Sequence, residues 1–158
     1  MGAQTEQKVS MHRFFSRLVT IVFVAIAGLG LPGHAAAQAV PHFSRGDAQF
    51  TSPNDFVGSG HATHLGSYTE VGHVTFAPTT NPNVLAVTGV AVYTAANGDE
   101  LHAVLSGELN LLTGAVTATV TYDGGTGRFA LASGSASLIG QMLGGGAITV
   151  TVSGIIDY

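Results

Sequence analysis

From Phe43 to the C-terminus, hydrophobic and polar residues alternate with a period of two. In residues 115–122 the even positions hold valine, alanine and tyrosine, and the odd positions hold alanine and threonine. Residues 148–153 repeat the pattern, with isoleucine or valine at even positions and threonine or serine at odd ones. This period predicts β-strands with one apolar face and one face that tolerates water.

Turn signals separate these strands at short intervals. The sequence AANGDE contains Asn97-Gly98, a pair that favours a hairpin between a strand at 84–94 and another at 101–109. The segment 84–94 is apolar on both faces, so we expect it to be the more fully covered strand. Seven or eight such strands, and no convincing amphipathic helix, predict an all-β sandwich or barrel.

An eight-stranded antiparallel barrel is the fold class that we predict. Closure removes the strand edges that a protein with few charges and no cysteine has little other means to protect. A barrel of this size is either filled by its own side chains or leaves room for one small ligand. Phe76, Phe129, Val120 and Val150 are the side chains expected to fill it in the first case.

The glycine cluster at 124–127 invites comparison with a phosphate-binding loop. Such a loop leads into a helix and carries a lysine, whereas here a strand-like segment follows and no lysine is present. We therefore interpret the cluster as a tight corner that turns Phe129 inward, with a bulge or close packing at Gly134. Arg128 is then expected at one end of the barrel, paired with an acid such as Asp123.

Three segments carry a resemblance to known proteins: ATHLGSYT (62–69), YTAANGDELHAVLSGEL (93–109) and GGTGRFALASGSASLIG (124–140). The last is similar to the GGTG-x-F…A-x-G signature of dirigent proteins and allene oxide cyclases. Together the segments resemble small secreted bacterial proteins of that barrel type. The resemblance implies an eight-stranded antiparallel barrel, and members with known activity steer or cyclise reactive hydrophobic intermediates inside it. None of their catalytic residues can be matched to positions here.

The N-terminal residues have the three parts of a secretory signal. Arg13 and Arg17 are basic, residues 18–31 are apolar, and the small residues that follow predict cleavage near Ala37 or Ala39. The apolar run is short for a bilayer crossing, so we expect no stable membrane anchor. We predict a signal peptide at 1–39, with Met11 as a possible true start, a single domain at 40–158, and a secreted or periplasmic location.

Charge narrows the range of partners. Removal of residues 1–39 takes away one of nine acidic and three of five basic residues, which leaves a formal charge of −6. Because only two arginines and no lysine remain, nucleic acid and anionic membrane surfaces are poor partners. Schiff-base and thiol chemistry are excluded by the absence of lysine from the mature chain and of cysteine from the whole chain. No cofactor is expected.

Glu70 is the strongest candidate for chemistry. In YTEVGHVTF it shares parity with Tyr68, Val74 and Phe76, so an unbroken strand would point it into the barrel with a raised pKa, able to act as an acid or base. A β-bulge at Gly72, which we favour, would instead send Glu70 to water.

Other residues are candidates beside Glu70. His64 is a possible interior companion for its carboxyl. Tyr68, Tyr93, Tyr122 and Phe76 are candidate ligand contacts, although packed tyrosines are the commoner case.

The five histidines of the mature chain do not form a metal motif. His61 and His64 are three residues apart, which places them on opposite faces of a straight strand. His102 has the parity opposite to its apolar neighbours and is expected to face solvent. We predict no metal site, and the serines lack the context of a catalytic nucleophile.

The function expected from these observations is the binding of a small hydrophobic molecule inside a secreted barrel. The alternatives are a cofactor-free isomerase or cyclase that uses Glu70 and His64, and a structural or adhesive surface protein. A homo-oligomer is possible, with Val87, Ala91 and Tyr93 as the expected self-association patch.

Overall fold

The computed structural model describes residues 38–158, which form a closed antiparallel β-barrel of eight strands. This confirms the predicted all-β barrel; the leader predicted at 1–39 falls almost entirely outside the described residues and stays a prediction. The strands are β1 (Val40–Phe50), β2 (Asp55–Ala62), β3 (Gly66–Pro78), β4 (Val84–Ala95), β5 (Glu100–Asn110), β6 (Ala115–Gly125), β7 (Ser133–Met142) and β8 (Ala147–Asp157). Two 3-10 turns, η1 (Gly127–Phe129) and η2 (Gly144–Gly146), lie in the connections on either side of β7.

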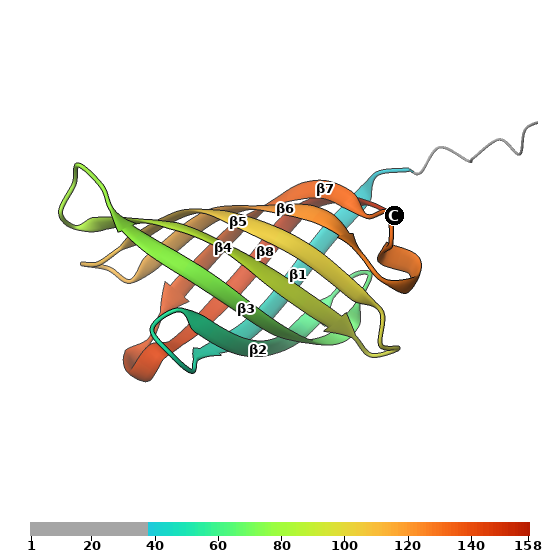
Figure 1. Ribbon diagram of the computed structural model, residues 1–158, viewed down its shortest axis with the longest axis horizontal. Helices are drawn as coiled ribbons and strands as arrows, with labels where there is room; N and C mark the ends of the chain where they lie inside the picture. The colour runs from blue at the N-terminus through green and yellow to red at the C-terminus, as the bar shows by residue number, and fades with distance from the viewer. Residues whose placement is uncertain (1–37) are drawn as a thin grey trace, which may run out of the picture. The chain divides into compact units, whose positions relative to one another are not determined.

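Each strand pairs with the next along the chain, and β8 pairs with β1 to close the sheet (Figure 1). The closing register runs from Val40 opposite Ile156 to Gln49 opposite Ala147. This seam is as long as the hairpin pairings, so every strand has a partner on both sides. Closure of the sheet therefore reduces the length of strand edge that could pair with another chain.

The period of two sorts side chains between the lumen and the outside. Even positions face inward on β1–β3 and β6–β8, and odd positions face inward on β4 and β5. The apolar parities predicted for 115–122 and 148–153 lie inside, where Val120 is fully buried and Val152 is 5% exposed. The alternation therefore assigned these faces correctly.

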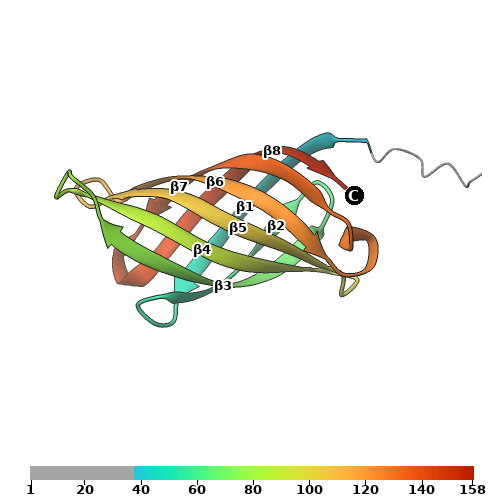
Figure 2. The same ribbon diagram turned by 45° about the horizontal axis from the view of Figure 1, so that its top comes forward.

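The two ends of the barrel differ, and the described chain starts and ends at the same one (Figure 2). At this closed end, the connection that contains η1 brings Phe129 into the barrel, where Phe129 and Ile156 are fully buried. At the opposite end, which we call the mouth, Phe50, Phe76 and Met142 face inward and are only partly buried. The barrel is thus more tightly packed at one end and more open at the other.

The glycine-rich corner at the closed end is built as expected, except for its ion pair. Gly124 and Gly127 have positive φ angles of 75° and 53°, which glycine adopts without strain. Arg128 does not pair with Asp123, because β6 carries Asp123 to the outer face. Instead, Nε of Arg128 lies 3.7 Å from Oδ2 of Asp99, and Nη2 of Arg128 donates a 2.7 Å hydrogen bond to the carbonyl oxygen of His64.

Strand β4 corrects two of the expectations. Val87, Ala91 and Tyr93, expected as an outer self-association patch, are 2–9% exposed and face the lumen. The outer face of β4 is not covered either, because Val90 is 53% exposed. Since this segment is apolar at both parities, its sequence does not distinguish the inner face from the outer one.

Candidate functional site

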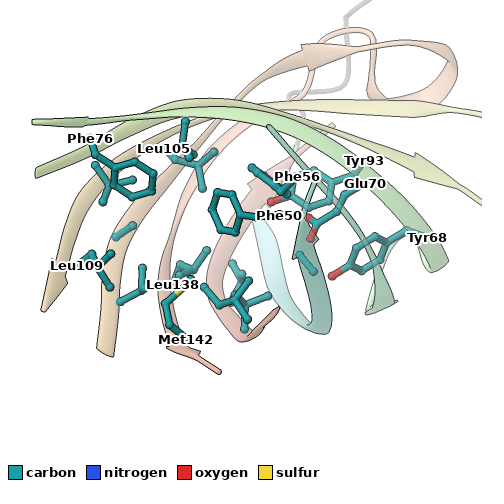
Figure 3. A pocket seen from close by; sticks show the side chains of 18 residues that line it. Phe50, Phe56, Tyr68, Glu70, Phe76, Tyr93, Leu105, Leu109, Leu138 and Met142 are labelled. Carbon is teal, nitrogen blue, oxygen red and sulfur yellow. The ribbon is translucent and has the colours of Figure 1, made fainter. Parts of the chain in front are cut away.

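A cavity occupies the half of the lumen next to the mouth (Figure 3). All eight strands contribute to its wall, which is almost entirely apolar. Its free volume is about 80 Å³, several times the roughly 10–15 Å³ that one water molecule needs on the same measure. The lumen is therefore neither completely filled nor a wide channel.

Three phenylalanines stand at the mouth of this cavity. The ring centroid of Phe50 lies 5.9 Å from that of Phe56 and 6.2 Å from that of Phe76. All three side chains are partly buried and line the cavity. Phe76, expected either to fill the barrel or to contact a ligand, lines the cavity without filling it.

Glu70 points into the cavity from β3, beside Tyr93 (Figure 3). The residue is 5% exposed, and its carboxyl group has no hydrogen-bond partner in residues 38–158 but opens onto the cavity. Burial raises the pKa of this carboxyl from its usual 4.5 to about 7. Glu70 is thus a buried acid close to the midpoint of its titration at neutral pH.

The bulge that we favoured at Gly72 is absent. Pairing with β2 runs without a break from Asp55 opposite His73 to Ala62 opposite Gly66, and pairing with β4 is equally regular. Gly72 has a different role, because the ring of Phe56 fills the space that a side chain at position 72 would need. The strand keeps its parity, and Glu70 stays inside.

Glycines on β1 and β2 make room for the large side chains of β3. A Cβ atom at Gly46 or Gly60 would lie 2.6 Å from the Tyr68 hydroxyl oxygen. A Cβ atom at Gly58 would lie 2.5 Å from Oε1 of Glu70. These three positions face inward without side chains, so the side chains of Tyr68 and Glu70 can pack directly against the backbone of β1 and β2.

The tyrosines expected to contact a ligand fall into two groups. Tyr68 and Tyr93 line the main cavity, with their rings in an edge-to-face arrangement at 5.5 Å. The Tyr68 hydroxyl and the Ser44 hydroxyl are hydrogen-bonded at 2.9 Å, and burial raises the pKa of both tyrosines. Tyr122 is not among the residues that line the main cavity; it lines a second, smaller one, which Tyr68 and Tyr93 also border.

The second cavity, about 10 Å³ in volume, lies toward the closed end. His42 lines it and is 4% exposed, and its Nδ1 atom has no hydrogen-bond partner among the described residues. Burial, with a smaller contribution from His64, lowers the pKa of His42 to about 4. His42 was not among the expected site residues, although it shares the parity of the inward-facing Ser44, a signal that could have placed it inside.

His64 is not a companion of Glu70. Strand β2 ends at Ala62, and His64 lies in the turn that follows, at the closed end. Its Nε2 atom is 2.8 Å from the carbonyl oxygen of Pro41, and its Nδ1 atom is 3.0 Å from the Tyr158 hydroxyl. The proposed acid–base pair is therefore not brought together by the fold.

The remaining histidines lie on the outer surface. His61 is exposed and lies within hydrogen-bond distance of Ser67, while His73 pairs with Asp55 at 2.7 Å. His102 faces outward as expected, 3.5 Å from Glu100. Across residues 38–158 there is no cluster of three or more histidine, aspartate or glutamate side chains that could hold a metal ion.

Chemically, the main cavity offers an apolar wall and one titratable carboxyl. No helix in the described part of the chain is both long and apolar enough to cross a membrane. Comparison with models of known families and with curated proteins finds no match to this chain. The closed barrel of eight antiparallel strands is compatible with the barrel type of fold that the sequence resemblance implies.

Proposed function

We propose that this protein is an exported binding barrel that holds a small hydrophobic molecule in its lumen. The observation that carries the proposal is the apolar cavity behind the phenylalanine mouth, with Glu70 as its buried carboxyl. Small-molecule sites are typically concave and mostly apolar, with few polar groups that fix the orientation of the ligand. The cavity has this composition.

The division of the lumen supports the same proposal. Phe129 is packed into the closed end, whereas Phe76 and Val150, which could have filled the other end, only line the cavity. A barrel with a purely structural role gains stability from a lumen filled throughout, since each void costs packing energy. A free volume kept at one end, lined by apolar side chains, favours a role for that volume.

Export is part of the proposal. The predicted cleavage sites after Ala37 and Ala39 lie just before β1, which begins at Val40, so either cleavage leaves all eight strands intact. N-terminal sequencing of the protein recovered from outside the cytoplasm should begin at Gln38 or Val40. Recovery of uncleaved chain from the cytoplasm alone would contradict export.

Binding is tested with an uncharged apolar dye, N-phenylnaphthylamine, whose fluorescence rises in apolar surroundings. We expect saturable binding to the purified protein and loss of binding in Ala118→Phe, because Ala118 faces the cavity from β6. The matched control is Thr119→Phe, which places the same ring on the exposed outer face of that strand. Equal dye binding by both variants would show that the lumen is not the site.

A second candidate function, acid–base catalysis, is favoured by one observation. A buried carboxyl without a hydrogen-bond partner and with a pKa of about 7 can both donate and accept a proton at neutral pH. This agrees with the isomerase or cyclase activity that the resemblance implies, without His64 as partner. Incubation with a lipid extract, followed by mass spectrometry, separates the two functions. A binder returns its ligand unchanged, whereas an enzyme returns a rearranged product that Glu70→Gln no longer forms.

A further inference from the structure

We propose that the ligand of the lumen is an amphiphile with an amine head group, which enters head first through the mouth and pairs with the Glu70 carboxylate. This inference rests on the proposed binding function and specifies the chemical class of the ligand. It starts from the contrast between an apolar wall and one unpartnered carboxyl.

The first step concerns the free energy of the buried carboxylate. Transfer of an ionised carboxyl from water to apolar surroundings is costly unless a counter-charge or hydrogen-bond donors accompany it. Within residues 38–158, Glu70 has neither, and the Tyr68 hydroxyl, on the same strand, is already hydrogen-bonded to Ser44. A ligand with an ammonium group would supply both the positive charge and the N–H donors.

The second step excludes an acidic head group. No arginine, lysine or histidine is among the residues that line the main cavity in the described part of the chain. Arg45 is exposed on the outer face of β1, and Arg128 lies at the closed end. A carboxylate head would therefore lie beside Glu70 with no counter-charge, and the two negative charges would repel each other.

The charge of the whole barrel acts in the same direction. Residues 38–158 contain eight acidic and two arginine side chains, a formal charge of −6 with histidine neutral. A field of this sign attracts cations to the protein and slows the approach of anions. The cationic amphiphile is favoured on approach as well as in the cavity.

The geometry of β3 sets the orientation of the ligand. Glu70 and Phe76 face the same lumen six residues apart, about 20 Å along the strand. A head group at Glu70 leaves the tail to run past Phe56 and Phe50 toward Phe76 and Leu109 (Figure 3). The apolar wall on that path suits a hydrocarbon chain. Because the free volume is about 80 Å³, roughly six water-sized spaces, the outer part of a long tail extends through the mouth.

Few other groups near Glu70 can titrate. Tyr93 faces it from β4 and Tyr68 lies on its own strand, and burial raises the pKa of both, so they stay neutral well above pH 7. On the side of β2 and β1 its neighbours are Gly58 and Ala48, which carry no charge. A pH dependence of ligand binding between pH 5.5 and 8.5 therefore reports on Glu70.

The test measures displacement of N-phenylnaphthylamine by dodecylamine, dodecanol and dodecanoate, which share one tail and differ in the head group. At about pH 8.5 the amine is protonated and Glu70 is ionised. We expect dodecylamine to displace the dye at concentrations roughly ten- to a hundredfold below those of dodecanol, the range expected for a charge-assisted pair. Dodecanoate should be the weakest. At about pH 5.5, Glu70 is mostly protonated and His42 is still neutral. At this pH the concentrations of dodecylamine and dodecanol that displace the dye should become more similar.

Glu70→Gln should abolish the preference for the amine, so that in this variant dodecylamine displaces the dye no better than dodecanol does. The matched control is Glu108→Gln, which removes the same charge from the exposed outer face of β5 and should keep the preference. Displacement by dodecanoate as strong as that by dodecylamine, or a preference that survives in Glu70→Gln, would overturn the amine inference. Failure of the dye to bind the wild-type protein would instead overturn the proposed function itself.

A measurement on the wild-type protein keeps the test valid if Glu70→Gln does not fold. The carboxyl carbon of Glu70 can be titrated by NMR with and without dodecylamine. A bound ammonium stabilises the carboxylate, so the midpoint of the Glu70 titration should fall below its value in the free protein. An unchanged midpoint at saturating dodecylamine would contradict the ion pair.

Discussion

Oε1 of Glu70 occupies the space that a side chain at Gly58 would need, since a Cβ atom there would lie 2.5 Å from that oxygen. Gly58 and Glu70 are directly opposite each other on β2 and β3. The carboxyl group of Glu70 thus packs against the backbone of β2 at Gly58, where the inner wall has no side chain. The absence of a side chain on one strand sets the position of the acid on the next.

Gly58→Ala should disturb both the strand pair and the acid. The new methyl group would also lie 2.8 Å from the Ala48 side chain and from a backbone oxygen of Asp47, so Glu70 cannot accommodate it alone. We expect a loss of unfolding free energy of about 1–3 kcal/mol, typical of an overpacked interior, measured by urea denaturation. Gly144→Ala is the control, because no atom lies within 4 Å of a Cβ there. Equal stability of the two variants would show that the wall tolerates a side chain at position 58.

Glu70 should make the barrel less stable as the pH rises. Its pKa is about 7 in the folded protein and 4.5 when unperturbed, so the folded state binds the extra proton between these values. Protonated Glu70 contributes fully to the unfolding free energy below pH 4.5, and this contribution is lost as the pH approaches and passes 7. The loss should reach at most about 3 kcal/mol. In Glu70→Gln this part of the pH profile should be absent, and a profile identical to that of the wild type would contradict the prediction.

His42 should make the barrel more stable as the pH rises, which is opposite to the effect of Glu70. Its pKa is about 4 in the folded protein and 6.5 when unperturbed, so the folded state resists protonation. Neutral His42 contributes fully to the unfolding free energy above pH 6.5, and this contribution is lost as the pH falls toward 4. Because Glu70 acts in the other direction over much of this range, the wild-type profile should be nearly flat there.

The effect of His42 is best measured in the Glu70→Gln background. There the unfolding free energy should fall on acidification from pH 6.5 to 4, and the added substitution His42→Gln should remove that fall. NMR titration of the ring protons checks the same point directly. A His42 ring that protonates near pH 6.5 would refute the prediction.

The alternation of side chains was sufficient to predict the barrel, but it did not predict for every strand which face points into the lumen. Along β6 and β8 the outer positions carry threonine and serine, so the apolar parity identifies the inner face. Along β4 both parities are apolar, and the distinction between Ala91 inside and Val90 outside depends on the register with β3 and β5. A single sequence contains no record of that register.

The candidate site was predicted in part for a similar reason. Parity alone points Glu70 inward, but whether the strand bulges at Gly72 is decided by Phe56, a residue on the neighbouring strand that fills the space above the glycine. His64 was misplaced because β2 ends at Ala62, and the turn that follows carries the histidine to the closed end. Both outcomes depend on contacts between strands, which the pattern along one strand does not contain.

The closed end should depend on Phe129 more than on any exposed residue of the same connection. Phe129 is fully buried, and its ring lies 4.8 Å from the Arg128 guanidinium carbon and 5.1 Å from the Tyr158 ring. Phe129→Ala should lower the unfolding free energy by about 3–5 kcal/mol, since a large cavity replaces the ring. Leu131→Ala, in the same connection but 88% exposed, should change it by no more than about 0.5 kcal/mol. Urea denaturation of both variants checks the difference, and similar losses in the two would mean that Phe129 does not anchor the closed end.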